Sequence, residues 1–243
     1  MRVALLTDIH ANLQALDAVL ADARSLGFDA LWQMGDVVGY GPDPDAVIAR
    51  LKELGASGVL GNHDAAAIGG LPLTDFNQLA ASANRWTAGV LSDESREYLA
   101  ALPRVKREGD FTLVHGSLRD PLWEYLVTHD AARAHFSLQE TTYGIVGHTH
   151  IPLVVEDATA AGLGAESPAH DDVVRLSGRK LAINPGGVGQ PRDGDPRACY
   201  ALLDTVADSV TFRRVEYDVS ATQKRMCDCG LPEPLILRLA RGR

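Results

Sequence analysis

The chain has 243 residues, 46% of them hydrophobic, and a formal net charge of -9. This acidic balance argues against broad electrostatic binding to nucleic acid or to an anionic membrane surface, although bound metal ions could reverse the charge locally around a phosphate. We find no signal peptide and no stretch of membrane-spanning length, and three cysteines are too few for a disulfide framework. We therefore expect a cytoplasmic protein.

The N-terminal quarter of the chain alternates short apolar runs with helical patterns. Residues 3–6, 29–34 and 58–60 predict strands, and residues 13–26 and 44–54 predict helices that each end at a glycine. This order predicts an α/β fold in which parallel strands are joined by right-handed crossovers. Ligands of such sheets collect at the carboxyl ends of the strands.

Helical spacing then dominates residues 65–102. We expect residues 1–243 to form one domain in which this segment is an insertion near the active site. The alternative is that residues 65–102 are ordinary core helices of the same domain.

The second half of the chain predicts an antiparallel or mixed sheet. Residues 157–172 are rich in Ala, Gly and acidic side chains without periodicity, and they predict a surface loop or a mobile hairpin. Further strands are predicted at 110–114, 143–146, 173–176, 180–183, 198–203 and 210–215. Amphipathic or helical segments are predicted at 123–126, 131–138 and 231–239.

Residues of metal-ligand type follow the predicted strand ends. They are Asp8, His10, Asp36, Asn62, His115, His148 and His150. Carboxylate, amide and imidazole groups from five loops suit two divalent metals. Asp36 is the candidate bridge between the metals, since the glycine before it allows close approach. Each residue alone has a plainer explanation, such as a helix N-cap for Asp8 or Asp36.

Taken in order, the motifs resemble the signature of the calcineurin-like metallophosphoesterase superfamily. They are Asp8-x-His10, Gly35-Asp36, Gly61-Asn62-His63-Asp64, His115 and Gly147-His148-x-His150, and the similarity runs from Met1 to about Arg197. The resemblance implies a four-layer α/β/β/α sandwich with a dinuclear metal centre. By position, Asp8, His10, Asp36 and His150 would hold one metal, and Asp36, Asn62, His115 and His148 the other.

The resemblance also implies hydrolysis of a small phosphate-ester substrate by a hydroxide held between the two metals. His63 would be the catalytic imidazole that protonates or stabilises the leaving oxygen. Asp64 is a candidate to orient an imidazole. The ligand types suit manganese, iron, zinc or nickel alike, so the sequence does not choose among these metals.

The chain departs from part of this superfamily after Asp36. Protein phosphatases and diadenosine tetraphosphate hydrolases carry Asp-Arg-Gly there, whereas residues 37–42 of this chain contain no arginine. In this respect the chain resembles the small bacterial and archaeal phosphoesterases, which are often phosphodiesterases. We therefore expect phosphodiesters as substrates, with phosphomonoesterase or nucleotide hydrolase activity as alternatives. A non-catalytic metal-binding scaffold is the rival from another class, but the chain retains His63 and every ligand.

Two further residues are candidates for substrate binding. Tyr40 could line the substrate pocket or pack under its own loop, and Arg192 could contact phosphate or be a plain surface arginine. Cys227 and Cys229 lack the Cys-x-x-Cys spacing of a metal or redox pair and are expected to be ordinary thiols. The sequence does not determine the oligomeric state.

Overall fold

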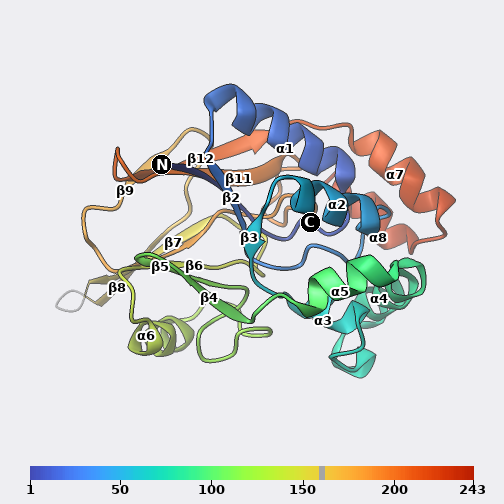
Figure 1. Cartoon of the computed structure of the whole chain (residues 1–243), viewed down its shortest axis with the longest axis horizontal. Coiled ribbons are helices and arrows are strands. Elements are labelled where there is room, and N and C mark those ends of the chain that lie inside the picture. The colour runs from blue at the N-terminus through green and yellow to red at the C-terminus, as the bar shows by residue number, and fades with distance from the viewer. Residues whose placement is uncertain (159–161) are drawn as a thin grey trace.

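The computed structural model describes residues 1–158 and 162–243, and it contains two six-stranded mixed β-sheets stacked on each other (Figure 1). The first sheet has the order β3 (Ser57–Gly58), β2 (Ala30–Gln33), β1 (Arg2–Leu6), β11 (Ala198–Asp204), β12 (Ser209–Val215) and β9 (Val173–Arg175). Strands β1, β2 and β3 are parallel, as predicted, and β11 joins β1 antiparallel.

The second sheet combines parallel and antiparallel neighbours. Its order is β4 (Val105–Glu108), β5 (Phe111–Val114), β6 (Tyr143–Ile145), β10 (Leu181–Asn184), β7 (Leu153–Ala158) and β8 (Gly162–Glu166). Strand β6 pairs in parallel with both β5 and β10, whereas β7 runs antiparallel to β10. The prediction of a mixed sheet in this half of the chain is confirmed.

Side chains of β1 show why its apolar run is continuous. Val3 and Leu5 belong to the core between the two sheets, whereas Ala4 and Leu6 belong to the core under the helices on the other face. Successive residues of a strand face opposite sides, so a strand covered on both faces must be apolar at every position. Full burial of a side chain such as Leu5 stabilises the fold by roughly 1.5–3 kcal/mol.

Helices cover the outer faces of both sheets (Figure 1). Helices α1 (Leu13–Leu26) and α2 (Pro44–Glu53) pack on the first sheet, and α6 (His129–Leu138) packs on the second. The resulting α/β/β/α sandwich confirms the predicted fold class. No helix in the described part of the chain combines the length and apolarity needed to cross a membrane.

The remaining helices gather at one side of the sandwich. The segment predicted as helical forms α3 (Asn62–Ala67), the 3-10 turn η1 (Leu73–Asp75), α4 (Gln78–Val90) and α5 (Asp93–Ala100). Helices α7 (Val219–Asp228) and α8 (Glu233–Leu239) pack against each other. A small apolar core joins Ala83 of α4, Met226 of α7 and Leu235 of α8 around Tyr40. This core links the C-terminal end of the chain to the loop that follows Asp36.

Four segments differ from the sequence prediction. Edge strand β4 was not predicted, because its sequence Val-Lys-Arg-Glu is polar and none of its residues is fully buried. Helix α7 was not predicted either, because it buries only Thr222 and Met226. Residues 123–126, predicted as an amphipathic segment, form the end of a turn and irregular backbone. Strand β7 was not predicted, but the hairpin that it forms with β8 agrees with the hairpin alternative for residues 157–172, of which residues 159–161 lie outside the described residues.

Candidate metal centre

The predicted ligands stand just beyond the strand ends of both sheets. Strands β1 and β2 run parallel, as do β5 and β6, so each pair ends at one edge. The structure places Asp8 and His10 after β1, Asp36 after β2, Asn62 after β3, His115 after β5, and His148 and His150 after β6. All of these residues are buried, with an exposed fraction of at most 5%.

The backbone turns sharply at most of these positions. Left-handed φ angles occur at Asp8 (53°), His10 (48°), Asp36 (51°), His148 (69°) and His150 (60°). Such a backbone costs a residue with a Cβ atom roughly 1–2 kcal/mol. Hydrogen bonds hold two of the turns together: Asp8 N donates to Gly35 O at 3.1 Å, and His10 N donates to Asp36 O at 2.9 Å.

The ligand atoms form two groups that share Asp36. The first group contains Asp8, His10, Asp36 and His150, and the second contains Asp36, His115 and His148; within each group, ligand atoms lie within 4.8 Å of one another. Asn62 adjoins the second group, since its Oδ1 lies 3.1 Å from His115 Nε2. The structure thus brings together all the residues that the sequence analysis named as ligands.

Backbone carbonyls orient the four imidazoles. One ring nitrogen of each histidine faces a carbonyl oxygen and therefore carries the proton. The contacts are His10 Nδ1 to Val38 O (3.0 Å), His115 Nδ1 to Met34 O (2.7 Å), His148 Nε2 to Trp123 O (3.1 Å) and His150 Nδ1 to Gln190 O (2.6 Å). The other ring nitrogen is thereby turned toward the cluster, which is the arrangement typical of metal-bound histidines.

Three atoms of the first ligand group face one another without a hydrogen-bond donor among them. His10 Nε2 lies 3.2 Å from His150 Nε2, although the protons of both rings are on Nδ1. Asp8 Oδ1 lies 3.3 Å from His150 Nε2 and has no hydrogen-bond partner among the described residues. Buried acceptors that face one another are costly unless a cation lies between them. The residues present therefore fit a divalent metal.

The backbone at Gly61 and His63 approaches the carboxylate of Asp36 closely and fixes it between the two ligand groups. Its Oδ1 accepts from His63 N at 2.9 Å, so Oδ2 is left facing His10 Nε2 at 3.6 Å and His115 Nε2 at 3.4 Å. A Cβ atom on Gly61 would lie 2.1 Å from Asp36 Oδ1. Only glycine fits there, which explains why α3 follows a glycine turn.

The carboxylate of Asp64 has a different role from the predicted one. Its two oxygens accept from the backbone N–H groups of Val38 (2.9 Å) and Gly61 (3.0 Å), not from an imidazole. Asp64 therefore joins the turn after Asp36 to the start of α3. The partner of His63 is instead Asn84 of α4, whose Oδ1 lies 3.0 Å from His63 Nδ1.

His63 lies beside the ligand groups and belongs to neither. Its ring packs against Tyr40, with centroids 4.4 Å apart, and against Phe76 at 5.1 Å. Burial lowers the pKa of His63 to about 4. With Nδ1–H donating to Asn84, the neutral ring has a lone pair at Nε2 and can donate from that atom only after it is protonated.

Burial also controls the protonation of the ligand histidines. It lowers the pKa of His148 to about 3 and holds those of His10 and His150 well below the usual range. Burial acts in the same direction on His115, but the charge and hydrogen bond of Asp36 outweigh it and raise the pKa of His115 to about 9. Three of the four ligand histidines are thus in the neutral form that binds metal.

A polar cavity of about 320 Å³ opens beside the two groups. Asp36, Asn62, His63, His148 and His150 line it, together with Tyr40, Asp75, Phe76, Asn77, Ala80, Trp123, Tyr125, Arg192 and Arg238. Both substrate-binding candidates from the sequence, Tyr40 and Arg192, are among them. The helical segment contributes Phe76 and Asn77, so it lies at the site.

Several lining residues were missed by the sequence analysis. Phe76 and Trp123 pack with ring centroids 4.8 Å apart, and Tyr125 stacks on His148 at 4.1 Å. Arg238 comes from α8, far along the chain. Isolated aromatic or basic residues in unpatterned segments carry no local signal, so only the folded structure reveals them.

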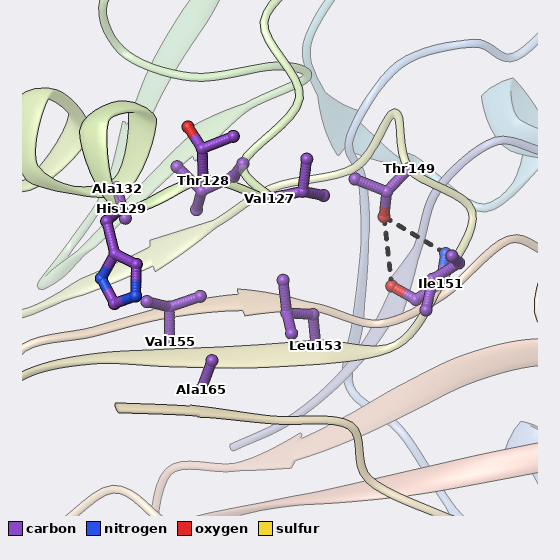
Figure 2. A pocket seen from close by; sticks show the side chains of 10 residues that line it. Val127, Thr128, His129, Ala132, Thr149, Ile151, Leu153, Val155 and Ala165 are labelled. Atoms are coloured by element: carbon purple, nitrogen blue, oxygen red, sulfur yellow. Dashed lines mark hydrogen bonds between the residues drawn. The ribbon is translucent and has the colours of Figure 1, made fainter. Parts of the chain in front are cut away.

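A second cavity, of about 210 Å³, is apolar and lies on the outer side of the second sheet (Figure 2). Leu126, Val127, Leu153 and Val155 contribute to its wall. Thr149 also lines it, and its hydroxyl forms hydrogen bonds with Ile151 (Figure 2). None of its lining residues belongs to either ligand group, so the polar cavity is the candidate active site.

Stacked mixed sheets with a buried Asp/His cluster beside a polar cavity define the class of metal-binding phosphoesterase sandwiches. The chain belongs to the calcineurin-like phosphoesterase superfamily, whose domain model matches residues 1–208. The resemblance found in the sequence is thereby confirmed.

Individual proteins resemble the chain over all or part of its length. A metallophosphoesterase from Sphaerobacter thermophilus is 43% identical and superimposes with a TM-score of 0.91, covering 100% of this chain and 99% of that one. The uncharacterized protein MJ0912 of Methanocaldococcus jannaschii is 35% identical, covering 99% of this chain and 98% of its own. A symmetrical bis(5'-nucleosyl)-tetraphosphatase of Nitrosococcus oceani is 35% identical over 53% of this chain and 43% of its own.

Proposed function

We propose that this protein is a dinuclear metal-dependent hydrolase of small phosphate esters. One observation carries the proposal: three buried acceptor atoms face one another without a donor, namely His10 Nε2, His150 Nε2 and Asp8 Oδ1. Asp36 is shared by both ligand groups and would bridge the two ions. When bound, two divalent ions lower the pKa of water and neutralise charge on the phosphoryl oxygens.

The side chains of this chain supply the rest of the chemistry. The ligand turns are fixed by backbone hydrogen bonds, so a bound phosphoryl group meets a preorganised site. His63 lines the cavity and is held by Asn84, and we assign it the exchange of a proton with the leaving oxygen at Nε2. Phe76 and Trp123 line the same cavity and limit the entry of water.

We propose that the reacting phosphoryl group is disubstituted, as in a phosphodiester. Val37 and Val38 follow Asp36 as fully buried apolar residues, so this turn offers no guanidinium to a second phosphate charge. A phosphoanhydride within a chain of phosphates has the same single charge at the reacting phosphorus. The partial similarity to bis(5'-nucleosyl)-tetraphosphatases supports such a substrate, although the missing arginine after Asp36 separates this chain from diadenosine tetraphosphate hydrolases.

Phosphomonoester hydrolysis is the second candidate, and the position of Arg192 in the cavity favours it. A guanidinium there could neutralise the second charge of a monoester. Comparing mono- and diesters with one leaving group separates the two functions. We expect diesters to react at least as fast, and a large preference for the monoester would favour the second candidate.

The central test combines metal analysis with a variant of His63. After loading with manganese, iron, zinc or nickel, elemental analysis should find two ions per chain. His63→Ala should keep both ions and lose about 10²–10⁴ in rate. A nitrophenolate needs little help from a proton, so the loss should be smaller on nitrophenyl esters than on alkyl diesters. A loaded sample with at most one ion, or one that hydrolyses no ester, would contradict the proposal.

A further inference from the structure

Two arginines from distant segments line the candidate active-site cavity. Arg192 lies in the loop after β10, and Arg238 lies on the C-terminal helix α8. The superfamily model ends at residue 208, so Arg238 is outside the part of the chain that the family defines.

The backbone of Arg192 is hydrogen-bonded to a residue of the candidate metal centre. Its backbone N donates to His150 O at 3.3 Å, and the carbonyl of Gln190 in the same loop orients the His150 ring. The guanidinium carbon lies 5.8 Å from the centroid of the Tyr40 ring. Its Nη2 donates to Gln190 Oε1 at 3.2 Å, whereas its Nε is buried without a partner among the described residues. Arg192 thus has N–H groups available beside the ligands.

Arg238 lines the same cavity. Its Nε donates to the main-chain oxygen of Arg243, and neither Nη group has a hydrogen-bond partner among the described residues. Burial, followed by the positive charge of Arg192, lowers the pKa of Arg238. Two guanidinium groups therefore share one partly desolvated cavity.

Neither arginine forms an ion pair with an Asp or Glu side chain among the described residues, and Asp36, which also lines the cavity, belongs to both ligand groups. Other partly buried arginines do pair, as Arg213 does with Asp22 at 3.0 Å. Asp75 also lines the cavity, but it is exposed and lies by Thr74, whose hydroxyl is 3.5 Å from its carboxylate. Adjacent like charges in a cavity are unfavourable without an anion, so their arrangement indicates that the ligand supplies the negative charge.

We propose that Arg192 and Arg238 form a second anion subsite, which binds a phosphate linked to the one that reacts at the metal centre. The substrate class is then a molecule with at least two linked phosphates. A cavity of about 320 Å³ is within the roughly 300–1,000 Å³ of ligand pockets. Phe76 and Trp123 offer flat rings on which the base of a nucleotide stacks. This inference rests on the proposed phosphoesterase function.

The first test measures how Arg238 variants change kcat/KM for each of two substrates, relative to the native chain. Bis(4-nitrophenyl) phosphate carries one phosphate, and diadenosine tetraphosphate carries four. Arg238→Ala should lower kcat/KM for the tetraphosphate about 10- to 100-fold, mainly through KM, and should affect the nitrophenyl diester several-fold less. Arg238→Lys should recover part of the loss. The exposed neighbour Arg241 provides the matched control, and Arg241→Ala should change neither substrate.

The second test measures binding without turnover. With free metal held constant by a metal buffer, calorimetry compares methylphosphonate with methylenediphosphonate, whose P–C–P linkage replaces the hydrolysable P–O–P bond. Methylenediphosphonate should bind the metal-loaded protein at least about tenfold more tightly, and Arg238→Ala should remove that advantage. Equal losses on both substrates, or an unchanged advantage in the variant, would overturn the subsite. Failure of the metal-loaded protein to hydrolyse any ester would instead overturn the proposed function, and the calorimetric result would still decide the subsite.

Discussion

The contact between His63 and Asn84 gives the sharpest expectation. Asn84→Asp keeps an oxygen 3.0 Å from His63 Nδ1 and gives it a negative charge. Asn84 is fully buried and His63 is 4% exposed, so water screens this charge weakly. The carboxylate should favour the imidazolium form and raise the pKa of His63. Asn84→Leu removes the acceptor and should lower that pKa.

The size of the change follows from the hydrogen bond. A bond to a charged group contributes ~1.5–3 kcal/mol, against ~0.5–1.5 kcal/mol for a neutral pair. The difference of about 1–1.5 kcal/mol corresponds to about one pH unit, at 1.36 kcal/mol per unit. Burial sets the native pKa of His63 at about 4, and the Asp variant should raise it by about one unit.

The assay is the pH dependence of kcat/KM on an alkyl phosphodiester. If protonated His63 is the active form, activity falls as pH rises through its pKa. The pH at which activity falls should be higher in Asn84→Asp and lower in Asn84→Leu than in the native chain. This fall in activity should be missing in His63→Ala. Elemental analysis and thermal unfolding show whether metals and fold are retained. An identical fall in activity in both Asn84 variants, with metals in place, would refute the positioning role.

Three further outcomes are expected. Asp36→Asn should weaken both metal sites, whereas His10→Ala should weaken one, and metal titration that finds both affinities unchanged in the Asp36 variant would argue against a bridge. Gly61→Ala should abolish metal binding, because its Cβ would lie 2.1 Å from Asp36 Oδ1; a fully loaded variant would contradict this. His135 lies outside the site, and burial lowers its pKa to about 4, below the ~6.5 of an unfolded chain. Protonation then favours unfolding, so about 3 kcal/mol of stability should disappear as pH falls from ~6.5 through 4, and an NMR titration giving an ordinary His135 pKa would disprove it.

The sequence was most informative where local patterns and chemistry coincide. Buried strand β1 reads as a continuous apolar run, and Asp8 and His10 follow it directly. The same pairing of strand end and ligand occurs at Asp36 and His115. The ligands could therefore be named before their distances were known, and the structure then placed them together.

The sequence was least informative where a residue's role depends on distant packing. Nothing around Asn84 or Arg238 distinguishes either residue from an ordinary helix residue. Asn84 reaches His63 only because α4 packs beside α3, and Arg238 reaches the cavity only because α8 packs around Tyr40. Asp64 is the opposite case, since its place in a motif suggested an imidazole partner, whereas the nearby N–H groups of Val38 and Gly61 take both its oxygens.

The left-handed turns at the ligands have a consequence for how such a site could be lost. Asp8, His10, Asp36, His148 and His150 occupy a conformation that glycine adopts without penalty. Replacing these residues with glycine would therefore relieve backbone strain and stabilise the fold. It would also remove the side-chain atom that binds the metal. In a lineage released from catalysis, these turns should be among the first to accept glycine, so that the fold gains stability as the chemistry disappears.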